Sequence, residues 1–219
     1  MTKNFETAYK GWNTAWLTEK GREDWSKPDP FITKNIQILK SFNCKKILDL
    51  GCGIGRHTLF LAQQGFSLTA LDGSKSGLYH LKIEANKRKL HIKTVCQTFD
   101  SMPFSKNSFD CVIAFNVIYH GDNKTIQKSL LEIRRVLKSG GIFFATFLSK
   151  KNSDFGLGEQ VAKDTFLRTH GYDKGHPHYY TNANDLTALL SGYEILSLTD
   201  QEHDRPNSFH WHLIAEKTK

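Results

Sequence analysis

Five short apolar runs recur along the chain, separated by stretches whose apolar residues repeat with helical spacing. Each run has the length and the β-branched or aromatic content of a buried strand. The predicted strands cover residues 46–50, 67–72, 92–97, 109–115 and 142–147. The last two runs are almost continuously apolar, as is typical of central strands that helices cover on both faces. The alternation therefore predicts an α/β fold with a parallel sheet.

The C-terminal part of the chain continues this pattern with one helix and two strands. The helix is predicted to begin at a Thr181 cap and to end at Gly192. The strands are predicted near residues 193–198 and 210–216.

A length of 219 residues is enough for one complete α/β core. We therefore expect a single domain over residues 1–219. Its predicted parts are a helical cap at 1–45, a core at 46–148, an insertion for substrate contact at 149–180, and the helix and strands of 181–219.

Three glycines at alternate positions follow the first predicted strand. Gly51, Gly53 and Gly55 let the backbone adopt conformations closed to other residues and bring its amides close to a ligand. A dinucleotide fingerprint would place its third glycine at Arg56, so the spacing argues against a pyrophosphate site. Asp72 ends the second predicted strand, 21 residues after Gly51, where a carboxylate can accept both hydroxyls of a ribose. A nucleoside-like ligand is therefore indicated.

These residues resemble a known family. Asp49 to Gly55 is similar to motif I of the class I S-adenosylmethionine-dependent methyltransferases, and three further matches follow in the family's order. They are Asp72, the segments Met102-Pro103-Phe104 with Ser108-Phe109-Asp110, and the segment from Glu132 to Gly141. Four ordered motifs over residues 40–148 are far more specific than one glycine pattern.

The resemblance implies a Rossmann-like, seven-stranded, mostly parallel sheet with helices on both faces and an antiparallel last strand. It implies S-adenosylmethionine as the cofactor. The implied cofactor-binding residues are Asp49, Gly51, Cys52, Gly53, Gly55, Arg56, Asp72, Gly73, Ser74, Thr98, Phe99 and Asn116.

Two positions depart from the family pattern. Ser139 replaces the usual proline, which reduces turn rigidity and changes no chemistry. Thr98 stands where the family usually has an aspartate for the adenine amino group. We therefore expect Thr98 and the Phe99 backbone at the adenine, with Asp100 as the substitute. For Arg56 two roles stay open, a contact with the cofactor carboxylate and a structural salt bridge.

The residues after the fourth strand are the candidates for acceptor chemistry. Methyl transfer from a sulfonium mainly requires positioning of the acceptor, and a general base helps where the acceptor must lose a proton. Tyr119 and His120 are the candidate catalytic residues, with His120 preferred as the base. The alternative is that His120 only hydrogen-bonds the turn before Gly121.

Two histidine pairs have the i, i+2 spacing that places side chains on one face of an extended segment, His176 with His178 and His210 with His212. No cysteine or acidic cluster completes a metal site in the sequence, so no metal is expected. We instead expect His176 and His178 to line the acceptor pocket with Tyr179 and Tyr180.

The net charge of +8 raises the question of a nucleic-acid substrate. Residues 74–97 carry six basic residues and one acidic residue, remote from the expected methyl site. A solvated basic helix is the preferred interpretation, and a nucleic-acid surface is the alternative.

The sequence also bears on compartment and on the N-terminal aromatics. Four cysteines without paired spacing, no signal-peptide pattern and no membrane-length apolar run lead us to expect a soluble cytoplasmic protein. Trp12, Trp16 and Trp25 are interpreted either as ordinary core or as part of a lid over the cofactor.

The hypothesis from the sequence is a methyltransferase that uses S-adenosylmethionine and acts on a small-molecule acceptor by in-line displacement. The alternatives are an RNA or protein methyltransferase of the same fold, and a cofactor-binding protein without catalysis. The sequence does not indicate the acceptor or the oligomeric state.

Overall fold

The computed structural model describes residues 8–218, so residues 1–7 of the expected helical cap and residue 219 lie outside the described part. The helices are α1 (Ala8–Ala15), α2 (Glu19–Glu23), α3 (Pro30–Lys34), α4 (Ile36–Ser41), α5 (Arg56–Gln63), α6 (Lys75–Lys87), α7 (Asn123–Val136) and α8 (Ala183–Leu189). The strands are β1 (Lys46–Leu50), β2 (Ser67–Asp72), β3 (Ile92–Cys96), β4 (Phe109–Ala114), β5 (Leu137–Ser149), β6 (Gln160–Ala162), β7 (Thr165–Leu167), β8 (Pro177–Thr181), β9 (Tyr193–His203) and β10 (Arg205–Lys217).

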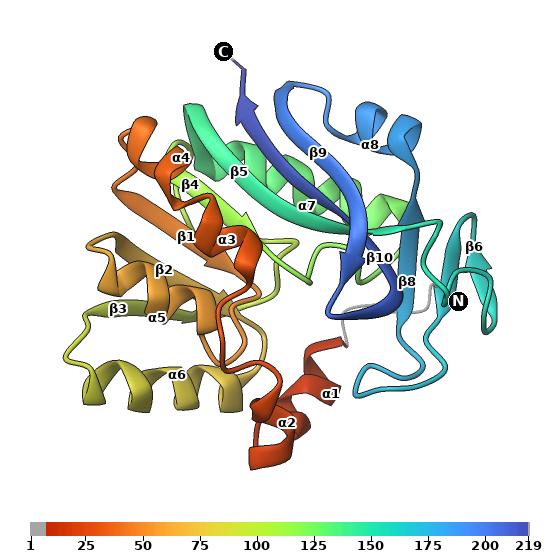
Figure 1. The fold of residues 1–219 in the computed structure, drawn as a ribbon, viewed down its shortest axis with the longest axis horizontal. Coiled ribbons are helices and arrows are strands. Elements are labelled where there is room, and N and C mark those ends of the chain that lie inside the picture. Colours follow the sequence, from red (N-terminus) through yellow and green to blue (C-terminus); the bar gives the residue numbers. More distant parts are fainter. Residues whose placement is uncertain (1–7, 219) are drawn as a thin grey trace.

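Seven strands of the ten-stranded sheet follow the order β3-β2-β1-β4-β5-β10-β9, and β8, β7 and β6 continue the sheet from the end of β5. Strands β1 to β5 pair in parallel, and β10 pairs antiparallel with both β5 and β9. This confirms the predicted seven-stranded, mostly parallel sheet with an antiparallel last strand (Figure 1).

Helices cover both faces of the sheet, with α3, α4 and α5 in front and α7 behind (Figure 1). Adjacent residues of each central strand point to opposite faces, so both must be apolar. On β4, Val112 packs in the core beneath α7 and α8, and Ile113 packs in the core beneath α3, α4 and α5. Phe143 and Phe144 divide in the same way on β5.

The family-like segments outside the glycine turn hold the fold together. Arg135 donates from Nη2 to the carbonyl oxygen of Met102 at 2.9 Å, and Glu132 accepts from the backbone N–H of Met102 at 3.0 Å. Asp110 accepts from the backbone N–H groups of Lys45 and Lys46 at 2.9 and 2.8 Å. These side chains therefore attach α7 to the loop before β4, and β4 to the start of β1.

Several predicted boundaries differ from the structure. β3, β4 and α8 end earlier than predicted, at Cys96, Ala114 and Leu189, and β9 and β10 are longer than predicted. Two further differences have a clear cause. β5 starts at Leu137 because it already pairs with Phe109 there, and Gly140 at φ +72° accommodates the register shift that follows. The C-terminal helix begins one residue later than predicted, because Asn182 supplies the cap and forms a capping box with Asp185. Thr181 instead ends β8.

The segment after β5 contains three short strands that the apolar pattern did not reveal. β8 pairs with the end of β5 at Leu148 and Ser149, and β7 pairs with β8. This pairing places residues 165–181 beside the carboxyl end of the main sheet. No helix in residues 8–218 is long and apolar enough to cross a membrane.

Candidate cofactor and acceptor site

The glycine turn between β1 and α5 has the strained backbone that its sequence predicts. Gly51, Gly53 and Gly55 all have positive φ angles, of +68°, +55° and +87°. A Cβ on Gly51 would lie 2.3 Å from Cγ2 of Val117, and one on Gly55 would lie 2.3 Å from Cδ1 of Leu81. Glycine is therefore required both by the turn and by the close approach of α6 and of the loop after β4.

Asp72 stabilises this turn, and Asp49 connects β1 to α5. Asp72 accepts from the backbone N–H groups of Gly53 at 2.8 Å and of Ser74 at 2.7 Å. Asp49 is buried and accepts a hydrogen bond from the Thr58 hydroxyl. Burial raises the pKa of Asp49 to about 6, and it also raises the pKa of Asp72.

A cavity of about 620 Å³ opens at the carboxyl ends of β1, β2 and β4. Nine of the predicted cofactor-binding residues line it: Gly51, Cys52, Gly53, Arg56, Asp72, Gly73, Thr98, Phe99 and Asn116. The remaining three lie next to that lining. Asp49 accepts a hydrogen bond from Thr58 of α5, Gly55 is the residue before α5, and the backbone N–H of Ser74 donates to Asp72.

The N-terminal helices cover the glycine turn. Trp12, Trp16 and Trp25 line the cavity, and the Trp12 and Trp16 rings stack at 5.0 Å. Arg56 lies over the Trp25 ring at 4.8 Å, a cation–π geometry that neither of the two expected roles included. Asn13 joins α1 to α6 by accepting from the backbone N–H of Ser76 at 3.0 Å.

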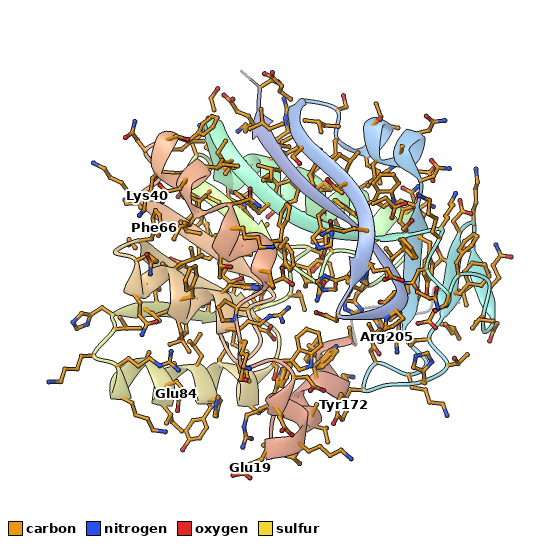
Figure 2. All side chains as sticks on the ribbon, viewed as in Figure 1. Glu19, Lys40, Phe66, Glu84, Tyr172 and Arg205 are labelled. Atoms are coloured by element: carbon orange, nitrogen blue, oxygen red, sulfur yellow. The ribbon has the colours of Figure 1, made fainter. Side chains whose placement is uncertain are left out.

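α1 also contacts the insertion, residues 149–180, through Trp12 and Gly11. Tyr172 lies beside α1 (Figure 2), and its ring is 5.6 Å from that of Trp12. A Cβ on Gly11 would lie 1.9 Å from the carbonyl oxygen of Tyr172, so this approach also requires a glycine. The tryptophans thus contribute to a cover that spans from the glycine turn to the insertion.

The expected adenine end of the cavity contains both the predicted residues and the substitute. Thr98, Phe99 and Asp100 all line it. Asp100 is buried and pairs with Lys128 of α7 at 2.9 Å. Lys128 itself lies outside the family-like motifs and was not expected here.

His120 lies at the other end of the cavity, where His176 joins it. His120 is 5 % exposed, and its Nδ1 has no hydrogen-bond partner among residues 8–218. Burial holds the pKa of His120 well below its usual value, so its imidazole is neutral near pH 7. Tyr119 packs behind His120 with ring centroids 4.8 Å apart, in a small core with Leu148. Burial raises the pKa of Tyr119, so its phenol stays protonated.

The insertion residues expected at the acceptor pocket separate into two groups. His176 lines the cavity, and His178 is buried behind it beside Asp173, with Nε2 2.9 Å from Oδ2. Tyr179 joins the main core, and Tyr180 packs against Phe155 and Phe166 instead. The sequence interpretation missed Asp173, although an acid five residues before His178 was a usable signal.

The second histidine pair belongs to a buried cluster behind the cavity. His210 and His212 lie on one face of β10 and contact His203 of β9, with ring centroids 4.7 and 5.1 Å from it. His203 Nε2 lies 2.9 Å from Nδ2 of Asn116. Asn116 has a positive φ of 60°, so the cluster holds a cavity residue in a strained conformation.

The chemistry of this lining fits S-adenosylmethionine. Each Asp72 oxygen accepts one backbone N–H and retains a further lone pair for a ribose hydroxyl. Nε1 of Trp16 is a buried donor without a hydrogen-bond partner in the described part of the chain. A Cβ on Gly73 would lie 2.8 Å from Cγ of Tyr9, so the close approach of α1 to the end of β2 requires a glycine there.

Comparison with known proteins agrees with this geometry. Residues 48–145 match the methyltransferase domain family. A ubiquinone biosynthesis O-methyltransferase of Rickettsia canadensis is 30 % identical over 73 % of this chain and 66 % of its own length. The corresponding protein of Rickettsia typhi is 32 % identical over 59 % of this chain and 53 % of its own length. The chain thus spans about half to two thirds of these relatives.

Solved structures with low sequence identity share the fold. A methyltransferase dependent on S-adenosylmethionine from Methanosarcina mazei has a TM-score of 0.72 at 21 % identity, covering 88 % of this chain and 99 % of its own. A 1,6-didemethyltoxoflavin-N1-methyltransferase of Burkholderia thailandensis, with bound S-adenosylhomocysteine, has a TM-score of 0.71 at 15 % identity, covering 97 % and 89 %. Residues 48–145 therefore belong to the methyltransferase domain family, and the fold around them is that of the class I S-adenosylmethionine-dependent methyltransferases.

Proposed function

We propose that this protein transfers a methyl group from S-adenosylmethionine to a small-molecule acceptor. The observation that carries the proposal is one continuous cavity that joins the glycine turn and Asp72 at one end to His120 and His176 at the other. A cofactor held at the first end has an acceptor space beside it. When bound, the cofactor supplies an electrophilic methyl group on a sulfonium leaving group.

The residues of this chain would do three things in that reaction. Asp72 and the glycine turn hold the nucleoside, and the tryptophan cover reduces the access of water. His120 is neutral because it is buried. Its ring would take up the proton that the methyl acceptor loses, or would form a hydrogen bond with the methyl acceptor. Tyr119 is a positioning residue, since its ring packs against the His120 ring.

The cavity volume of about 620 Å³ supports a small acceptor. The relatives' names indicate an acceptor in ubiquinone biosynthesis, whereas the name of the Burkholderia neighbour indicates nitrogen methylation. The acceptor atom is therefore left open in the proposal. Labelled methyl transfer from S-adenosylmethionine into a metabolite extract, followed by mass spectrometry, would identify it. A His120→Gln variant should lower kcat and leave cofactor binding unchanged.

Calorimetry tests the cofactor directly. We expect S-adenosylhomocysteine to bind and NAD to bind much more weakly, because the glycine spacing does not suit a pyrophosphate. Asp72→Asn should weaken S-adenosylhomocysteine binding by about 10 to 100-fold through the loss of charge-assisted hydrogen bonds to the ribose. Asp24→Asn, at an exposed residue outside the cavity lining, is the matched control. Tight NAD binding without binding of the sulfur nucleoside would overturn the proposal.

An RNA acceptor is the main alternative within the same fold. The basic stretch that suggested it lies on and after α6, where Lys87 and Arg88 both pair with Glu84. Figure 2 shows Glu84 on α6, at the edge of the molecule away from β10. A steeply salt-dependent RNA affinity that is lost in Lys87→Gln with Arg88→Gln would favour this alternative.

A further inference from the structure

His120, His178 and Asp173 converge at the wall of the cavity. One ligand atom from each lies within 4.8 Å of the other two. All three residues are largely buried, with exposures of 5 %, 1 % and 9 %. Such a cluster of two imidazoles and one carboxylate is a donor set that transition metals prefer.

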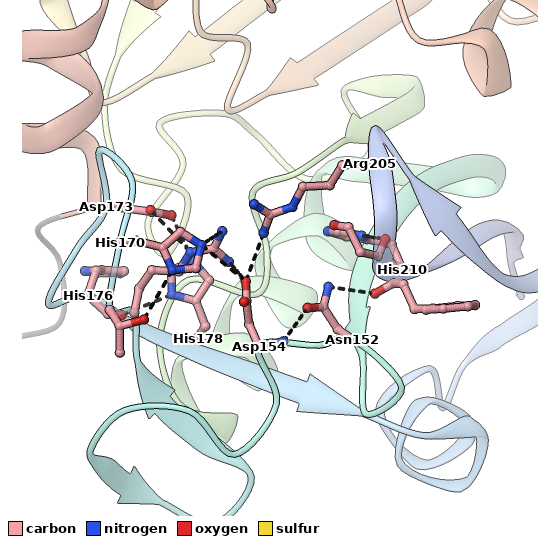
Figure 3. Close-up of polar contacts among 12 residues, drawn as sticks. Asn152, Asp154, His170, Asp173, His176, His178, Arg205 and His210 are labelled. Atoms are coloured by element: carbon pink, nitrogen blue, oxygen red, sulfur yellow. Dashed lines mark hydrogen bonds and ion pairs between the residues drawn. The ribbon is translucent and has the colours of Figure 1, made fainter.

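The hydrogen bonds of His178 leave its second nitrogen facing a carboxylate. Nδ1 lies 3.0 Å from the carbonyl oxygen of His176, which only accepts, so Nδ1 carries the proton. In a neutral ring Nε2 is then an acceptor, yet it lies 2.9 Å from Oδ2 of Asp173 (Figure 3). Two acceptors at this distance repel each other unless a cation or a second proton lies between them.

His120 supplies a further acceptor at the same place. Its ring centroid is 4.7 Å from that of His178, and its Nδ1 has no hydrogen-bond partner among the described residues. A nitrogen that is this deeply buried normally has a partner. Nδ1 of His120 is therefore available as a metal ligand.

The backbone holds these residues in place. His120 forms a β-bridge with His178, and the backbone N–H of Gly121 donates to the carbonyl oxygen of Pro177 at 2.9 Å. Arg168 approaches the other Asp173 oxygen, Oδ1, at 3.8 Å and pairs more closely with Asp154 at 3.0 Å. Oδ2 of Asp173 therefore points to the histidines.

We propose that His120, His178 and Asp173 bind a divalent transition metal such as Zn²⁺. His176 lies beside them, with its ring centroid 5.5 Å from that of His120. Because His120 and His176 line the cavity, a metal at this site is accessible from it. Three protein ligands and an open position are typical of a metal that binds a substrate oxygen. An acceptor with an ionisable hydroxyl would suit such a metal, because the bound metal would favour loss of the hydroxyl proton in place of the His120 ring; this last point rests on the proposed function.

Metal titration without cofactor tests the site on its own. The full chain is prepared without a histidine tag, treated with a chelator, and titrated with Co²⁺ while the visible absorption is recorded. We expect one equivalent of Co²⁺ per chain, bands typical of a nitrogen and oxygen ligand set, and displacement by Zn²⁺. Absence of saturable binding would overturn the proposal whatever the outcome of S-adenosylhomocysteine calorimetry.

Variants locate the binding. Asp173→Asn and His120→Gln keep side-chain size closely, and each should weaken metal affinity at least about tenfold, as loss of a ligand or of its orientation does. His91→Ala, at an exposed histidine before β3, should leave the affinity unchanged. Circular dichroism confirms folding of each variant. Equal metal affinity in the wild type and in both ligand variants would place the metal elsewhere and overturn the proposal.

Discussion

Each glycine of the turn after β1 is constrained by a different neighbour. Gly51 faces Val117, Gly55 faces Leu81, and a Cβ on Gly53 would lie 3.2 Å from the Trp16 ring. Three elements therefore meet at one turn, which leaves its backbone N–H groups available to a ligand. Asp72 reinforces the turn by accepting from Gly53.

A pair of glycine substitutions separates ligand binding from backbone strain. Gly53 and Gly65 both have positive φ angles, of +55° and +89°, so alanine should cost about 1 kcal/mol of stability at either position. Gly53→Ala should also lower S-adenosylhomocysteine affinity at least about tenfold, because its Cβ enters the space beside Trp16. Nothing lies within 4 Å of a Cβ at Gly65, so Gly65→Ala should leave the S-adenosylhomocysteine affinity unchanged. Urea unfolding and calorimetry measure the two effects, and equal affinities would contradict this assignment.

At the scale of elements, α1 connects parts of the chain that are distant in sequence. It contacts α6 through Asn13 and the insertion through Tyr172, while Trp12 and Trp16 line the cavity. These contacts place Trp12 and Trp16 over the cavity between the glycine turn and the insertion. We therefore favour the lid interpretation over ordinary core packing.

Removal of one ring tests that interpretation. Trp12→Ala should raise the dissociation rate of S-adenosylhomocysteine by about tenfold, because the stacked cover would lose one of its members. Leu17→Ala is the control in the same segment, since Leu17 is 68 % exposed and is not a ring of this cover. Stopped-flow displacement gives both rates. A loss of stability in Trp12→Ala without a change in dissociation would support the core interpretation instead.

At the scale of the whole molecule, buried histidines link the site to the C-terminal hairpin. Burial lowers the pKa of His210 to about 3 and that of His212 to about 4. Each lies below the unfolded value of about 6.5. The unfolded chain therefore binds more protons below pH 6.5, and the stability contributed by these neutral rings is lost as the pH falls from there towards the folded pKa.

This linkage predicts a pH-dependent stability. Between pH 7 and pH 5, His210 alone should reduce the free energy of unfolding by about 2 kcal/mol. His210→Gln cannot titrate and keeps a donor for the carbonyl oxygen of Ser208, so the variant should lose about 2 kcal/mol less over that range. Urea unfolding at both pH values measures the difference. Identical pH dependence in the two proteins would show that His210 does not titrate as its burial implies.

Local patterns were sufficient to predict much of this protein. The order of strands and helices, the glycine turn and the carboxylate of Asp72 follow from apolar periodicity and from backbone conformations that only neighbouring residues determine. The antiparallel last strand came from the family resemblance. Boundaries were less accurate, as at Leu137 and Asn182, because strand pairing and capping decide them.

The sequence by itself thus determined the fold class and the methyl donor, since both are encoded in short, contiguous segments. Only the tertiary structure decided which distant side chains meet. Trp12 reaches the cavity because α1 docks on α6, and Asp173 reaches His120 because β8 pairs with the end of β5. Such contacts depend on the crossover of whole elements, which no local spacing specifies.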